Sequence, residues 1–197
     1  MDTAVPAAPT KTAGSDVAEP APLRVLADTI FARTSPYEGV GLRNHCTRLH
    51  LFATALMRHR GLAFDTDLAY LLAMVHDLGI VSEKDEGVNY LRRSCALFHR
   101  ETAGVALPPI APDVLDECLV YNHRVLPVPD LSPEAECFRN AVMMEHSHGM
   151  LRFGLAKDDV RPVFDAHPRG NFDRVLMDFT WRTIRREPLT IVRGIFF

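Results

Sequence analysis

The chain has 197 residues, of which 47% are hydrophobic and 24% charged, and its formal net charge is -3 at pH 7. This length is enough for one domain with a full core, and the composition is ordinary for a soluble globular protein. The weakly acidic balance argues against nucleic acid or an anionic membrane as a partner. No apolar run approaches the roughly 20 residues of a membrane helix.

The four cysteines are scattered through the chain and form no C-x-x-C pair: Cys46, Cys95, Cys118 and Cys137. This pattern argues against a structural zinc site and a disulfide framework, and it predicts small buried hydrophobic side chains. The N-terminus has no basic segment leading into an apolar core, so a secretory signal is not expected. These features predict a cytoplasmic protein and leave a homo-oligomer open.

Helical periodicity runs through most of the chain. Residues 1–22 are rich in Ala, Pro and Thr and lack large apolar side chains, which predicts a flexible tail before one domain at 23–197. The predicted helices lie at about 23–32, 42–59, 66–77, 89–106, 112–123, 133–149, 158–166 and 172–185. Residues 189–197 are predicted to be extended and packed over the body. No convincing strand alternation occurs, so the predicted fold class is all-α.

The stretch from Ala69 to Gly79 organises this prediction, because it reads as an apolar helix ending on the adjacent pair His76 and Asp77. Burying an unpaired carboxylate beside an imidazole costs roughly several kcal/mol unless something compensates. A divalent cation such as Zn, Fe, Mn or Co compensates well, since imidazole and carboxylate together suit these metals. The simpler interpretation is a His-Asp hydrogen bond near a helix end.

Further polar residues are predicted to face the core from neighbouring helices. The full inward-facing set is His45, His76, Asp77, His99, His123 and Glu145. His50 and His59 are assigned to the surface, and His146 is rotated away from the apolar face. Four histidines and two acids in one small core are hard to explain structurally, because buried charges are normally paired or coordinated. The set therefore favours a metal site.

The pattern of His45, the pair His76-Asp77 and a later acid resembles the HD superfamily of metal-dependent phosphohydrolases over about residues 42–179. The resemblance implies a single HD-domain helical bundle that binds one or two divalent ions, Fe, Mn or Zn. His99 and His123 are similar to the two extra histidines of the dinuclear branches, in which the aspartate of the pair bridges both ions. Residues 44–48, 64–65 and 167–172 are more similar to the cyanamide-hydratase-like branch.

Two departures from the family pattern concern the ligands. The final ligand is normally aspartate, whereas Glu145 stands at the suitable place here, with His148 as the alternative. The cyanamide-hydratase-like branch usually lacks a histidine where His99 stands.

Two basic residues are candidates for contacts with the substrate. Arg48 lies one turn from His45 and Lys84 lies in the loop after the His76-Asp77 pair, and either side chain is suited to bind a phosphate or carboxylate.

The predicted function follows from the ligands. Divalent ions lower the pKa of a bound water and direct it at an electrophile, with Asp77 as the central catalytic carboxylate. We expect a hydrolase of a small molecule, first of all a phosphate ester. The alternatives are a cyanamide-hydratase-like hydro-lyase, a di-iron HD oxygenase, and a non-catalytic metal-binding helical domain.

Overall fold

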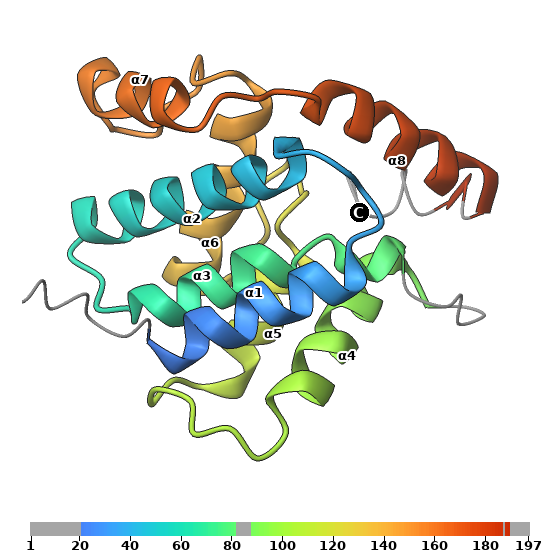
Figure 1. The fold of residues 1–197 in the computed structure, drawn as a ribbon. Helices are drawn as coiled ribbons and strands as arrows, with labels where there is room; N and C mark the ends of the chain where they lie inside the picture. Colours follow the sequence, from blue (N-terminus) through green and yellow to red (C-terminus); the bar gives the residue numbers. More distant parts are fainter. Residues whose placement is uncertain (1–20, 82–87, 187, 190–197) are drawn as a thin grey trace, which may run out of the picture.

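A computed structural model describes residues 21–81, 88–186 and 188–189. Within these ranges the chain is all-helical and contains no strand, as predicted (Figure 1). The elements are α1 (Pro22–Thr34), α2 (Gly41–His59), α3 (Thr66–Val75), the 3-10 turn η1 (Leu78–Ile80), α4 (Tyr90–Thr102), α5 (Pro112–Val120), α6 (Pro133–His146), α7 (Lys157–Ala166) and α8 (Phe172–Arg186). Residues 1–20 of the predicted tail and residues 190–197 of the predicted extended segment lie outside the described residues.

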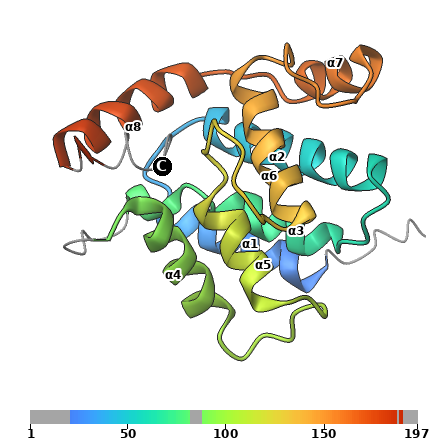
Figure 2. The same cartoon turned by 180° about the vertical axis from the view of Figure 1, so that it is seen from behind.

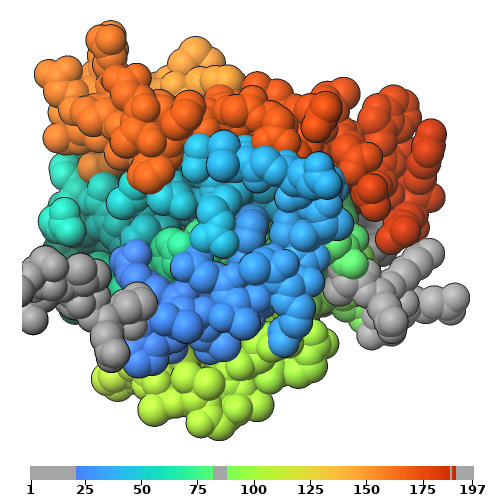
Figure 3. All heavy atoms as spheres, viewed as in Figure 1, coloured from blue at the N-terminus to red at the C-terminus, as the bar shows by residue number. Residues whose placement is uncertain are grey.

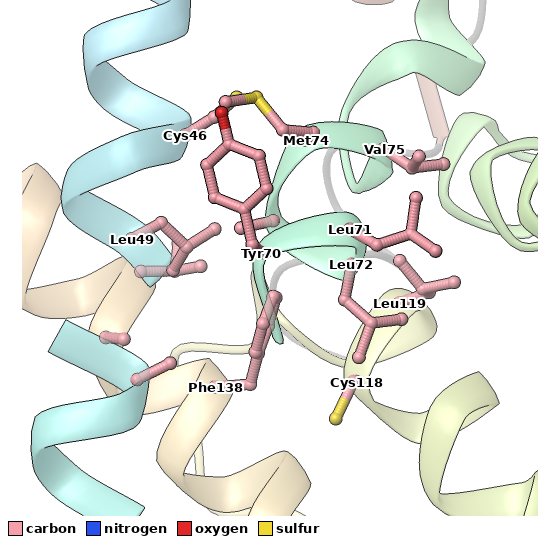
Figure 4. Close-up of a cluster of buried hydrophobic side chains, with 14 of the residues drawn as sticks. Cys46, Leu49, Tyr70, Leu71, Leu72, Met74, Val75, Cys118, Leu119 and Phe138 are labelled. Atoms are coloured by element: carbon pink, nitrogen blue, oxygen red, sulfur yellow. The ribbon is translucent and has the colours of Figure 1, made fainter. Parts of the chain in front are cut away.

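Helix α3 forms the centre of the fold and packs against α1, α2, α4 and α5. Every residue from Leu68 to Val75 is buried, as expected for a helix that is apolar on all sides. Figure 4 shows Leu71 and Leu72 facing α5, while Leu49 of α2 lies on the other side of α3. The end of α3 is therefore fixed in the middle of the protein. No helix in the described part of the chain is long and apolar enough to cross a membrane.

The helix caps follow the sequence closely. Asp65 accepts hydrogen bonds from the backbone N–H groups of Asp67 and Leu68 at the start of α3, and Ser132 caps α6 in the same way. The helix ends differ from the prediction. Helix α3 stops at Val75, and Asp77 precedes the turn η1. Helix α5 stops at Val120, so His123 lies in the turn beyond it.

The turn η1 is held by α4. Gly79 donates its backbone N–H to Ser94 Oγ at 2.9 Å and accepts Arg93 Nε–H at 2.9 Å. A Cβ at Gly79 would lie 2.0 Å from the Tyr90 carbonyl oxygen, so only glycine permits this approach of the two backbones. The chain just after His76 and Asp77 is thus pinned against a neighbouring helix.

Helices α7 and α8 form a layer across α2 (Figures 1 and 2). The space-filling view shows this layer as a continuous orange-to-red band along one edge of the molecule (Figure 3). The connection between the two helices, residues 167–171, crosses the N-terminal half of α2: Pro168 O accepts from Asn44 Nδ2 at 2.8 Å. This connection brings Phe172 to the interior, where it is 2% exposed.

His50 corrects the surface assignment made from periodicity, because its side chain is buried at 5% exposure, whereas His59 is exposed as predicted. The His50 ring lies edge-on to Tyr70, with 5.3 Å between the ring centroids, and its Nδ1 has no hydrogen-bond partner. Helix α2 is covered by α3, α6, α7 and α8, so its buried surface is wider than one stripe. Burial, with the positive charge of Arg24, lowers the pKa of His50 from 6.5 to about 4.

We predict a measurable pH effect of His50 on stability. Between pH 6.5 and 4 the unfolded chain protonates this histidine and the folded chain does not, so the unfolding free energy falls as the pH is lowered through that window. In urea denaturation of metal-free protein at pH 7 and pH 4.5, His50→Leu should reduce this fall by about 2–3 kcal/mol. His59→Leu, on the exposed end of the same helix, is the control. An equal fall in the His50→Leu and wild-type proteins would contradict the assignment.

Candidate metal centre

Three histidines converge on the carboxylate of Asp77. His76 Nε2 lies 3.0 Å from Asp77 Oδ2, and His45 Nε2 lies 3.3 Å from His76 Nε2 and 3.8 Å from the same oxygen. His123 Nε2 lies 3.0 Å from the other oxygen, Oδ1. His45 and His76 are fully buried, and the ligand atoms of His45, His76 and Asp77 all lie within 4.8 Å of one another. Imidazole nitrogens and a carboxylate at this separation suit a divalent transition metal.

The contacts of Nδ1 in His76 and His45 determine which ring nitrogen faces the cluster. His76 Nδ1 lies 2.7 Å from the backbone carbonyl of Ala73, so Nδ1 carries the proton and donates it. His45 Nδ1 lies 2.9 Å from Glu145 Oε2. The bond of His76 leaves its Nε2 facing Asp77, as in metal sites where an outer acceptor fixes the tautomer of the ligand. The contact of His45 with Glu145 is close but does not have hydrogen-bond geometry.

The electrostatics of the cluster call for a positive charge at its centre. Two Nε2 lone pairs 3.3 Å apart, facing a carboxylate, repel one another unless a proton or a metal ion lies between them. Burial by itself would lower the pKa of His76, but the Asp77 carboxylate raises that pKa well above its ordinary value. The Asp77 carboxylate thus favours a positive charge at His76, and a metal ion that binds there would replace any proton on the facing nitrogen.

Glu145 is not placed as a ligand, which corrects the prediction. Its carboxylate contacts the outer face of His45, through Nδ1, whereas the cluster lies at Nε2. Glu145 is fully buried, and its Oε1 accepts from Arg48 Nε at 3.1 Å, from Arg48 Nη2, and from Arg169 Nη1 at 2.8 Å. Burial opposes ionisation, yet His45 and Arg48 hold the pKa of Glu145 well below its usual range. Glu145 orients His45 and remains a carboxylate.

Arg48 is also in a different place from the one predicted. It is fully buried, and besides its bonds to Glu145 it donates to the backbone carbonyl of His167 at 2.6 Å. All the hydrogen bonds of Arg48 that the structure gives go to Glu145 and the His167 carbonyl, which indicates a positioning role. Arg169, which the sequence did not single out, shares the same carboxylate.

His146 belongs beside the cluster although periodicity rotated it away. Successive imidazole centroids lie 5.3 to 5.9 Å apart in the order His45, His76, His123, His146 and back to His45. His146 Nε2 is buried with no hydrogen-bond partner. Burial and the neighbouring His123 lower the pKa of His146 to about 3, so its ring is neutral and has a free electron pair to offer.

The remaining predicted site residues lie elsewhere. His99 is half exposed, and its Nε2 lies 2.6 Å from Asp116 Oδ1 on the surface of α4 and α5, apart from the cluster. His148 is exposed with a φ of 54° and lines a pocket with Arg152 and Phe164. Lys84 falls outside the described residues.

Aromatic side chains enclose the cluster. Phe172 stacks on His45, with ring centroids 4.2 Å apart and planes 9° from parallel, and Tyr90 lies 6.2 Å from His123. Side-chain exposure is 10% at Asp77 and 14% at His123, so solvent reaches the cluster on the Asp77 and His123 side. Comparisons with known families, with curated proteins and with solved structures find no match for this chain. The resemblance to the HD superfamily thus depends on the residues themselves.

The buried ion pair predicts the effect of losing Arg48. Arg48→Ala leaves Glu145 buried with Arg169 as its remaining cation, and breaking a buried pair costs about 3–5 kcal/mol. Arg43→Ala removes an exposed pair from the same helix, with Asp28 at 2.6 Å, and should cost about 1 kcal/mol or less. Urea denaturation of the metal-free proteins measures both. Equal losses in the two variants would contradict a structural role for Arg48.

Proposed function

We propose that this protein is a metal-dependent hydrolase of the HD type, acting on a small anionic molecule, first of all a phosphate ester. The observation that carries the proposal is the convergence of the Nε2 atoms of His45 and His76 on Asp77 Oδ2, with their Nδ1 atoms engaged from outside. This arrangement reproduces the His and His-Asp part of the family pattern. A divalent cation bound there would lower the pKa of a coordinated water and supply a nucleophile at neutral pH.

The chain contributes a preorganised ligand set. Glu145 and Ala73 fix the ring orientations of His45 and His76, so no side chain has to turn when the ion binds. Arg48 and Arg169 neutralise Glu145, which lets a carboxylate stay buried behind a ligand. Phe172 covers the face of His45 and keeps water from that side, while the exposed edge at His123 and Asp77 gives the substrate its approach.

A second ion on the other oxygen of Asp77 is part of this proposal. His123 faces Oδ1, whereas His45 and His76 lie on the Oδ2 side. His146, with its unpartnered Nε2, lies next to His123 and takes the place that the sequence gave to His99. Asp77 would bridge two ions, with His45 and His76 on one side and His123 and His146 on the other.

The alternative chemistries of the family use related ligands. A hydro-lyase would need one ion and a nitrile-type substrate, and an oxygenase would need two iron ions. Three assays distinguish these chemistries. Hydrolase activity releases p-nitrophenol from p-nitrophenyl phosphate with Mn²⁺, hydro-lyase activity converts cyanamide to urea with Zn²⁺, and oxygenase activity takes up O₂ with Fe²⁺.

The test combines Mn²⁺ stoichiometry with turnover. The wild type should bind about two Mn²⁺ per chain, and His123→Ala and His146→Ala should each bind about one. Asp77→Asn should lose both ions and at least about 100-fold in turnover, because a bridging ligand matters more than the outer partners that cost 10–100-fold. Asp67→Asn, in helix α3, and His59→Ala, on the exposed end of α2, are the controls and should keep both ions and the activity.

Two outcomes count against the proposal. Full Mn²⁺ content and full turnover in Asp77→Asn would reject the metal centre. One ion in carefully loaded wild type, with turnover abolished in Asp77→Asn, would reject the second ion and keep the hydrolase.

A further inference from the structure

Helices α4 and α5 carry a second group of metal-binding side chains, which is not part of the central cluster. Cys95 and His99 come from α4 and Asp116 comes from α5. Their ligand atoms Sγ, Nε2 and a carboxylate oxygen lie within 4.8 Å of one another. Asp116 Oδ1 lies 2.6 Å from His99 Nε2 and 3.3 Å from Cys95 Sγ.

The helical backbone places these groups together. Cys95 and His99 are four residues apart, so they lie on one face of α4 one turn from each other. Asp116 meets them from α5, which packs against α4. Cys95 is 9% exposed, while the side chains of His99 and Asp116 are 49% and 50% exposed. The group is thus anchored in the surface at its sulfur end and open to solvent at its imidazole and carboxylate end.

An ordinary surface pair does not account for all three side chains. An exposed His-Asp pair contributes about 1 kcal/mol or less, and it needs no thiol. The Cys95 thiol shares the carboxylate oxygen with the imidazole, although burial and the nearby Asp116 raise its pKa to about 12 and make it a weak donor. Sulfur, imidazole nitrogen and carboxylate oxygen together are the ligand set of zinc and cobalt sites.

We propose that Cys95, His99 and Asp116 form a second metal site for a zinc-like divalent ion. In binding, Cys95 Sγ gives up its proton to solvent as the sulfur–metal bond forms. The His99 ring, whose Nε2–H faces Asp116 in the ion-free protein, takes the neutral form protonated at Nδ1, so that His99 Nε2 and Asp116 Oδ1 donate electron pairs and water completes a four-coordinate ion. No oxidation or reduction takes place. The site stands independently of the proposed hydrolase activity.

Such an ion would cross-link the two helices that shape the approach to Asp77. Helix α4 holds the turn η1 through Ser94 and Arg93, next in sequence to Cys95. Helix α5 leads directly into the turn that carries His123. A metal bridge between α4 and α5 would therefore fix the segment after Asp77 relative to His123.

Cobalt spectroscopy tests the site, because Co²⁺ bound to a thiolate shows a sulfur-to-metal charge-transfer band that imidazole and carboxylate ligands do not give. Titration of metal-free protein with CoCl₂ should develop this band, and at saturation its intensity should correspond to one thiolate-bound ion per chain. Cys95→Ser should abolish the band. His99→Ala and Asp116→Asn should each raise the Co²⁺ concentration for half-maximal absorption at least about 10-fold. Excess Zn²⁺ should bleach the band in the wild type.

The control is Cys46→Ala. The Cys46 thiol lies beside His76, so it is the cysteine that could give a similar band with Co²⁺ bound at the central cluster. This variant should keep the band. Circular dichroism checks that each variant is folded. If Cys95→Ser is unstable, the result for His99→Ala decides, because His99 is half exposed and its replacement should not disturb the core. The proposal fails if the wild type binds Co²⁺ without the band, if Cys95→Ser retains it, or if only Cys46→Ala removes it.

Discussion

Two imidazole lone pairs cannot point at one carboxylate in a dry interior unless a positive charge lies between them. At the end of α3, His45 and His76 are held in this arrangement by acceptors on their far sides, Glu145 and the Ala73 carbonyl. The His76 ring is held in one tautomer, because its Nδ1 would otherwise lose the Ala73 carbonyl as its acceptor. The packing of α2, α6 and the end of α3 thus creates a place suited to a cation or a proton.

That arrangement depends on a second charge network behind the first. Glu145 is fully buried and would be costly as an isolated anion. Arg48 from α2 and Arg169 from the connection between α7 and α8 satisfy its Oε1, and His45 takes Oε2. Three segments distant in the sequence, α2, α6 and the α7–α8 connection, therefore meet at one carboxylate. The α7–α8 layer is part of the centre even though none of its residues faces Asp77.

The fold could be predicted almost entirely from the sequence, since apolar periodicity and caps such as Asp65 and Ser132 are local signals. The burial of the candidate ligands His45 and His76 was also predictable, because each continues the line of apolar residues on the buried side of its helix. The placements of His146 and His99 were predicted wrongly, because the apolar periodicity of a helix does not always show which side chains face inward. Helix α6 is buried nearly all round, so His146 could face inward from a position off the expected face. His99 lies at the edge of the buried face of α4, where one turn separates a 9% exposed Cys95 from a half-exposed imidazole.

The positions of Arg48 and Glu145 show a further limit. The spacing placed Glu145 on an inward face and Arg48 one turn from His45, but the sequence could not show that these two side chains, 97 residues apart, pair with each other. Such long-range pairing is decided by tertiary packing, and no local signal reports it. In contrast, the segment Met144-Glu145-His146-Ser147-His148 was predicted to lie at the site, and the structure places Glu145 and His146 of this segment beside His45.

The central claim is that His45 and His76 present Nε2 to a cation, and nitrogen-15 NMR of the imidazole rings tests it most directly. With Zn²⁺ bound, both rings should be neutral, carry their proton on Nδ1, and show an Nε2 resonance displaced from that of the metal-free protein. Rings that carry the proton on Nε2, or Nε2 resonances that Zn²⁺ leaves unchanged, would contradict it.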